Sequence, residues 1–162
     1  MSTPDIVIRP ERPDQPEIVA LLDALDAYLG SLYAPEANHI LGVQALLAPE
    51  VTFLAARAGG AAVGCGATRR MAGEEATGGA PYGEIKRMYV LPALRGRRVA
   101  ARLLQALEAT LAGQGLRQAL LETGRDQTEA VRLYERAGYA RRGPFAGYPD
   151  NGLSLFYEKR LA

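Results

Sequence analysis

The chain has 162 residues, of which 48% are apolar, and its formal net charge is +1. This length fits one domain of ordinary size, and the apolar content predicts a packed core rather than a disordered chain. The nearly balanced charge argues against a nucleic-acid-binding protein, because such proteins usually carry a strong basic excess.

The first half of the chain predicts a strand, two helices and two further strands. They are expected at residues 6–9, 16–30, 38–47, 51–57 and 61–70. Apolar residues from Pro16 onward repeat at the spacing of one helix face, and Gly30 is a residue type that often ends a helix. The pair Gly59-Gly60 between the last two strands is typical of a hairpin turn.

The second half predicts alternating strands and helices and ends on two strands. They are expected at residues 82–90, 99–111, 119–122, 126–137, 139–142 and 153–160. Asp126 and Glu129 resemble a capping box at the start of the last helix. The complete order is β-α-α-β-β-β-α-β-α-β-β. It predicts one α/β domain over residues 1–162, with a mixed sheet and helices on its faces.

A cluster of arginines stands where a strand gives way to a helix. The loop Arg95-Gly96-Arg97-Arg98 precedes a helix that is expected to begin near Val99. The first turn of a helix carries unpaired N–H groups and a partial positive charge, so arginines beside it are unfavourable unless an anion binds there. Pyrophosphate fits this arrangement, although the spacing alone equally allows a solvated basic turn.

The same segment resembles the acyl-CoA-binding motif of the GNAT acetyltransferase superfamily, (Q/R)-x-x-G-x-(G/A). Arg95 fits the first position and Ala100 the last, whereas Arg98 stands where the motif has its middle glycine. The backbone amide of Arg98 can still bind phosphate if its dihedral angles are helical. If the loop requires a positive φ there, we expect the cofactor to bind less well.

Two flanking segments extend the resemblance. The strand E-I-K-R-M-Y-V-L-P resembles the family's fourth strand, which splays from its neighbour and frees amides for the pantetheine arm. The segment A-V-R-L-Y-E-R-A-G-Y resembles the second conserved block, and Gln127 precedes it where many members have an asparagine. The resemblance implies a GNAT-like fold with splayed central strands and acetyl-CoA as cosubstrate. The implied cofactor-binding residues are Met88, Tyr89, Val90, Arg95, Gly96, Arg97, Arg98, Val99, Ala100 and Gln127.

The resemblance also implies a mechanism, in which an amine of a small molecule or peptide attacks the thioester directly. In this interpretation the Val90 N–H stabilises the oxyanion and Tyr134 protonates the leaving thiolate. Glu84, six residues before Val90, is the implied general base, and strand alternation places Glu84, Lys86, Met88 and Val90 on one face. The competing interpretations are a core aromatic for Tyr134 and an ion-paired rim glutamate for Glu84.

The acceptor site implied by the resemblance lies over the first two helices and the late strands. Its candidate residues are Tyr33, Glu36, Asn38, Phe145 and Tyr148. His39 is the single histidine, and a surface or capping role is expected for it. With Cys65 as the single cysteine, we expect neither a disulfide nor a soft metal site, and hence no metal cofactor.

Two other functions stay open from the sequence. One is a non-catalytic domain that senses acyl-CoA, and the other is an unrelated α/β domain that binds another phosphorylated ligand. The first residues contain no basic and apolar leader, and no apolar run approaches the roughly 20 residues that span a bilayer. We therefore expect a soluble cytoplasmic protein without a membrane or nucleic-acid partner, for which the family resemblance allows a homodimer.

Overall fold

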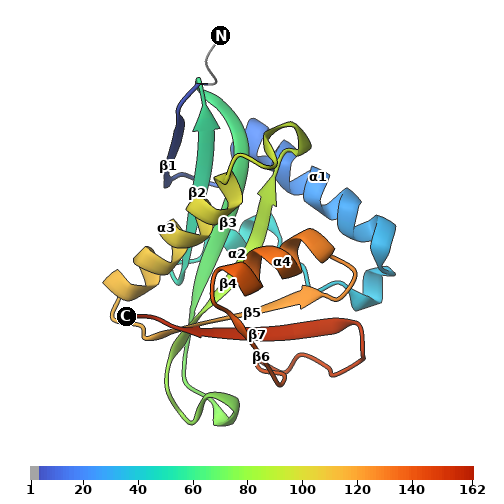
Figure 1. Cartoon of the computed structure of the whole chain (residues 1–162), viewed down its shortest axis with the longest axis vertical. Helices are drawn as coiled ribbons and strands as arrows, with labels where there is room; N and C mark the ends of the chain where they lie inside the picture. Colours follow the sequence, from blue (N-terminus) through green and yellow to red (C-terminus); the bar gives the residue numbers. More distant parts are fainter. Residues whose placement is uncertain (1–3) are drawn as a thin grey trace.

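The computed structural model describes residues 4–162, and within them a seven-stranded sheet carries helices on both faces (Figure 1). The strands are β1 (Ile6–Pro10), β2 (Val51–Ala58), β3 (Ala61–Met71), β4 (Tyr82–Val90), β5 (Gln118–Gly124), β6 (Ala140–Arg142) and β7 (Ser154–Arg160). The helices are α1 (Pro16–Leu32), α2 (Val43–Leu46), α3 (Val99–Gly113) and α4 (Thr128–Arg136). Their order confirms the predicted one.

The sheet is mixed, as predicted, and its strand order is β1-β2-β3-β4-β5-β7-β6. Strands β4 and β5 are parallel, whereas the other neighbours are antiparallel. Helix α1 packs on one face, where Ile18 and Leu22 meet Cys65 of β3. Helices α3 and α4 cover the other face, where Leu103 and Tyr134 share one core cluster. Each fully buried leucine of this kind contributes about 1.5–3 kcal/mol.

Two predicted helix boundaries on the α1 face are wrong. Helix α1 does not end at Gly30 but continues to Leu32, where the Tyr33 N–H still bonds to the Leu29 carbonyl. A glycine inside a helix costs only about 1 kcal/mol, which the buried apolar face of α1 outweighs. The helix expected at residues 38–47 is reduced to α2, because Gly42 adopts an extended conformation before it. Residues 38–42 form a loop instead.

The sheet splits between β4 and β5. The two strands pair only at three positions, from Gly83 opposite Ala119 to Ile85 opposite Leu121. Beyond Ile85, β4 continues to pair with β3 on its other side, and β5 continues along β7. This divergence confirms the predicted splayed strands.

A bulge in β4 overturns the prediction that Glu84, Lys86, Met88 and Val90 share one face. The register with β3 shifts between Cys65 and Ala67, and Arg87 within the bulge has a φ of 59°. Lys86 lies opposite Ala67, which belongs to the core under α1, whereas Val90 packs into the core under α3. An extra residue in a strand reverses the alternation of side chains after it.

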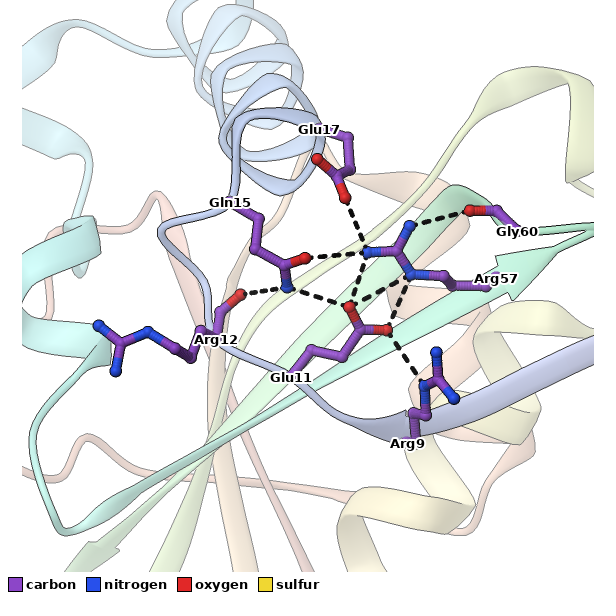
Figure 2. A network of polar contacts seen from close by, with 7 residues as sticks. All are labelled: Arg9, Glu11, Arg12, Gln15, Glu17, Arg57 and Gly60. Carbon is purple, nitrogen blue, oxygen red and sulfur yellow. Dashed lines mark hydrogen bonds and ion pairs between the residues drawn. The ribbon is translucent and has the colours of Figure 1, made fainter.

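An ion-pair network joins the segment before α1 to β2 (Figure 2). The Arg57 guanidinium donates to Glu11 at 2.7 Å, to Glu17 at 2.9 Å and to the Gly60 carbonyl at 2.9 Å. The Glu11 side chain is only 10% exposed, and its hydrogen bonds with Arg57 lower its pKa to about 2. The network fixes the start of α1 on the sheet.

Candidate active site

A pocket lies where β4 and β5 separate. Its walls come from the second half of α1 and the loop after it, from β4 beyond Gly83, from the end of β5, and from α4. The polar side chains that line it include Tyr33, His39, Lys86, Glu122, Gln127 and Tyr134. Because α1 and α4 lie on opposite faces of the sheet, the pocket is lined from both faces at the split.

The backbone of β4 offers hydrogen-bond donors to this split. The Leu91 N–H donates to the Val63 carbonyl on β3 at 2.9 Å. Successive N–H groups along a strand point in opposite directions, so the N–H of Val90 points away from β3. That side is the one on which β5 no longer pairs with β4. The arrangement suits the oxyanion donor that the sequence analysis assigned to Val90.

The arginine loop ends at the N-terminus of α3, which begins at Val99 as predicted. The first intrahelical bond of this region runs from the Arg102 N–H to the Arg98 carbonyl, so the amides of the first turn are free for a ligand. Gly96 has a φ of 81°. Free amides, a glycine and neighbouring arginines form a site that fits a pyrophosphate group.

Arg98 is left-handed, with φ 63° and ψ 18°. Of the two alternatives left open by the sequence, the structure has the positive φ, for which weaker cofactor binding is expected. The loop adopts the backbone for which the family motif has a glycine, and a side chain costs about 1 kcal/mol there. The cost arises because Cβ crowds the backbone at positive φ, and every residue other than glycine carries a Cβ atom.

We expect Arg98→Gly to be more stable than Arg98→Ala by about 1 kcal/mol, because both variants lose the charge and only glycine removes Cβ. Urea unfolding of the two purified variants measures the difference. Equal midpoints would contradict a left-handed conformation at this position.

Tyr134 projects from α4 into the pocket and is 6% exposed. Within residues 4–162 its hydroxyl has no hydrogen-bond partner. Burial, and then the nearby charge of Glu122, raise the pKa of this phenol, so that it stays protonated at neutral pH. Tyr134 also packs edge-on against Tyr139 at 5.8 Å. It is thus a core aromatic whose hydroxyl lies at the split.

Glu84 is 2% exposed and lies beside the pocket rather than among the residues that line it. The Tyr148 hydroxyl donates a short hydrogen bond to its carboxylate, and the Lys86 ammonium donates to the same oxygen at 3.4 Å. Lys86 also donates to the Tyr148 hydroxyl at 2.6 Å. The candidate base from the sequence is therefore engaged by two donors from its own side of the sheet.

Glu122 on β5 lines the pocket and was missed by the sequence analysis. Burial raises the pKa of its carboxyl group, and a hydrogen bond with Ser154 opposes that shift. The available signal was the alternation in Leu-Leu-Glu, which turns Glu122 to the same face as Leu120. Without the split, that position would have been an ordinary strand residue.

His39 also lines the pocket, in contrast to the surface or capping role expected for it. Its ring packs edge-on against Tyr148 at 5.0 Å. Its Nε2 atom is buried and has no partner among the described residues.

The model of the acetyltransferase (GNAT) family matches residues 18–139. The chain belongs to the GNAT acetyltransferase family. It is 45% identical to an IAA acetyltransferase of Azospirillum brasilense, over 98% of this chain and 99% of the relative.

Solved structures share the fold. A protein of Klebsiella pneumoniae subsp. pneumoniae MGH 78578, described as an acyl-CoA N-acyltransferase, is 38% identical, with a TM-score of 0.79 over 97% of this chain and 98% of that one. An N-acetyltransferase of Thermoplasma acidophilum in complex with coenzyme A has a TM-score of 0.74 at 17% identity, covering 96% and 99% of the two chains. The chain is thus an acyltransferase enzyme with the GNAT fold.

Among the acceptor candidates of this acetyltransferase, Tyr33 and Asn38 line the pocket. The Tyr33 hydroxyl accepts a hydrogen bond from the Asp126 N–H at 3.0 Å. Phe145 is buried in an aromatic cluster, and Glu36 is exposed on the 3-10 turn after α1, away from the pocket lining. The pocket therefore unites some of the predicted acceptor residues and leaves the others outside.

The start of α4 differs from the predicted capping box. Gln127, not Asp126, is the residue before the helix, and no side chain caps the first turn. The Gln127 side-chain oxygen instead accepts a hydrogen bond from the Gly124 N–H at 2.8 Å, at the end of β5. Gln127 still lines the pocket of the acetyltransferase, at the position where its resemblance implies a cofactor contact.

Cys65 is buried, and burial raises the pKa of its thiol to about 12, which makes it a core residue of the acetyltransferase rather than a nucleophile. Across residues 4–162, no cluster of three or more His, Cys, Asp or Glu side chains could hold a metal ion. No helix in that range is long and apolar enough to cross a membrane.

Proposed function

We propose that the protein transfers an acetyl group from acetyl-CoA to an amine of a small molecule or peptide by direct attack. The observation that carries this proposal is the split between β4 and β5 beside the free N-terminus of α3. Backbone donors and a buried phenol lie at the split, and the loop that suits pyrophosphate precedes α3 on the same face of the sheet as the phenol.

Acetyl-CoA would lie along this line of free backbone groups. The N–H of Val90 faces the split and, together with that of Met88, would pair with the pantetheine arm. The loop from Gly96 and the first turn of α3 would hold the pyrophosphate. When bound, the thioester supplies an acyl group that is activated for attack by a neutral amine.

Three groups of the chain would serve the reaction. The Val90 N–H stabilises the charge that develops on the thioester oxygen. The Tyr134 hydroxyl, which is protonated at neutral pH, gives its proton to the departing sulfur. A carboxylate must take a proton from the amine, because alkylamines are protonated near pH 7. Glu84 is the candidate from the sequence, and Glu122 is a second one.

The relative from Azospirillum brasilense carries the name IAA acetyltransferase, so IAA is an acceptor to test beside simple amines. We further propose that the enzyme works in the cytoplasm, which the free buried thiol of Cys65 supports.

Calorimetric titration with acetyl-CoA tests the proposal, with ATP and NAD as controls. We expect micromolar binding that is selective for acetyl-CoA, followed by thiol release when an acceptor amine is added. Binding without thiol release to any amine would favour an acyl-CoA sensor. Equal binding of ATP would point to a site for another phosphorylated ligand.

A further inference from the structure

Two carboxylates lie near the split, Glu84 buried and Glu122 half-buried, and their surroundings differ. Glu84 accepts hydrogen bonds from Tyr148 and Lys86, and Lys86 forms its ion pair with it. Glu122 lies one strand away and lines the pocket itself. Within the described chain it forms no salt bridge, and Ser154 is the polar neighbour that lowers its pKa.

The basic side chains around the pocket form their salt bridges with other carboxylates. Arg87 is paired with Asp26 of α1 at 2.6 Å, and Lys86 is paired with Glu84. Glu122 is the pocket carboxylate without a salt bridge among the described residues, and the basic groups that act on it from a distance are His39 and Lys86. Holding an ionised carboxylate in a largely buried site is unfavourable unless an opposite charge accompanies it.

We infer that the pocket binds its acceptor as a cationic amine on the Glu122 carboxylate, and that Glu122 takes the proton from this ammonium. The inference rests on the proposed function and specifies the acceptor side of the same site. Leu25 and Leu29 of α1 also line the pocket, so the amine is attached to an apolar group. The unpartnered Nε2 of His39 provides a further polar contact for this ligand.

The proton balance follows from these positions. Glu122 accepts one proton from the ammonium, and the freed lone pair of the nitrogen forms the new C–N bond. The C–S bond breaks, and the sulfur takes the proton of the Tyr134 hydroxyl. The nitrogen loses its second proton as the amide forms, and this proton restores Tyr134. Glu122 then releases its proton to solvent, so that one proton leaves for each amide formed.

The surroundings of Glu122 suit a base at neutral pH. Burial holds the pKa of its carboxyl group above the ordinary value, which brings it closer to that of a working base. The ionisable groups that act on it are His39 from the loop after α1, Lys86 and Glu84 from β4, Tyr134 from α4, and Tyr148 from the loop between β6 and β7. Because the carboxylate form is the one that accepts, kcat/KM rises with pH through the pKa of Glu122.

The first test uses the protein labelled with ¹³C at the glutamate carboxyl carbons, and phenethylammonium as the probe amine. The Glu122 signal is the one missing from the Glu122→Gln spectrum. We expect the probe to move this signal at pH 7, whereas the uncharged isostere 2-phenylethanol does not. A Glu122 signal that ignores the amine, while acetyl-CoA binds normally in the calorimeter, overturns this inference and leaves the proposed function intact.

The second test measures thiol release from acetyl-CoA with phenethylamine as acceptor. Glu122→Gln keeps the shape of the side chain, and we expect kcat/KM for the amine to fall at least about 100-fold with the Kd for acetyl-CoA unchanged. The rising limb of the pH profile disappears in this variant. Glu158→Gln on β7, which pairs with Arg142 outside the pocket, is the matched control. A larger loss in Glu84→Gln than in Glu122→Gln assigns the base to Glu84 and overturns the inference.

Discussion

Replacing Tyr134 by phenylalanine should lower kcat by about 100-fold, because the departing thiolate loses its proton donor. The Kd for acetyl-CoA and the free energy of unfolding should change little. The hydroxyl has no hydrogen-bond partner in residues 4–162, so its removal leaves no buried group unpaired. Thiol release under saturating acetyl-CoA measures the change in kcat.

Tyr139→Phe is the control for this experiment. Tyr139 packs against Tyr134, but its hydroxyl donates to Glu108 at 2.8 Å on α3, outside the pocket. We therefore expect the opposite result, with lower stability and unchanged kcat. A Tyr134→Phe enzyme with the kcat of the parent would reduce Tyr134 to its role in the core.

The stability of the fold should fall as the pH drops from about 4.5 towards 2, and Glu11 should account for a large part of the loss. Its pKa is lowered from 4.5 to about 2 in the folded chain. A lowered carboxyl pKa contributes stability above the unfolded-state value, and that contribution is lost as the pH falls through the folded-state value. The shift corresponds to at most about 3 kcal/mol, reduced by solvent screening.

Urea unfolding of the parent and of Glu11→Gln between pH 2 and 7 tests this expectation. The variant should be less stable at pH 7, and the two curves should converge at low pH, where the parent carboxylate is also protonated. Asp14→Asn is the control, because Asp14 pairs only with the exposed Arg12. Parallel curves for the parent and Glu11→Gln would show that the network in Figure 2 contributes nothing to the acid dependence.

The sequence predicted the order of elements because each strand and helix carries its own local pattern. Gly59-Gly60 and Pro16 marked boundaries by backbone preference alone, and both lie where expected. The helix end predicted at Gly30 was wrong for the same reason, because a local backbone preference does not account for the stability that α1 gains from burying its apolar face. The loop at residues 38–42 likewise depends on packing over the split, which no local pattern encodes.

The parts of the candidate site that belong to a recognisable sequence motif were predictable. The arginine loop and Tyr134 lie where the resemblance placed them, on a loop and a helix with recognisable sequences. The bulge at Arg87 was not predictable from alternation, and it separates Glu84 from Val90. Glu122 and His39 reach the pocket only because β5 diverges from β4 and a loop folds over the opening, and both are tertiary effects.

Strands β4 and β5 pair at only three positions, so the rest of this edge of β4 carries unused hydrogen-bonding groups. A strand edge with unused hydrogen-bonding groups usually lies at the rim of a sheet, where another chain can add to it. Here such an edge lies in the interior, between α1 and α4, where a neighbouring molecule cannot align with it. The unpaired backbone groups of β4 thus stay available to a small ligand, whereas another protein chain cannot add a strand to them and start aggregation.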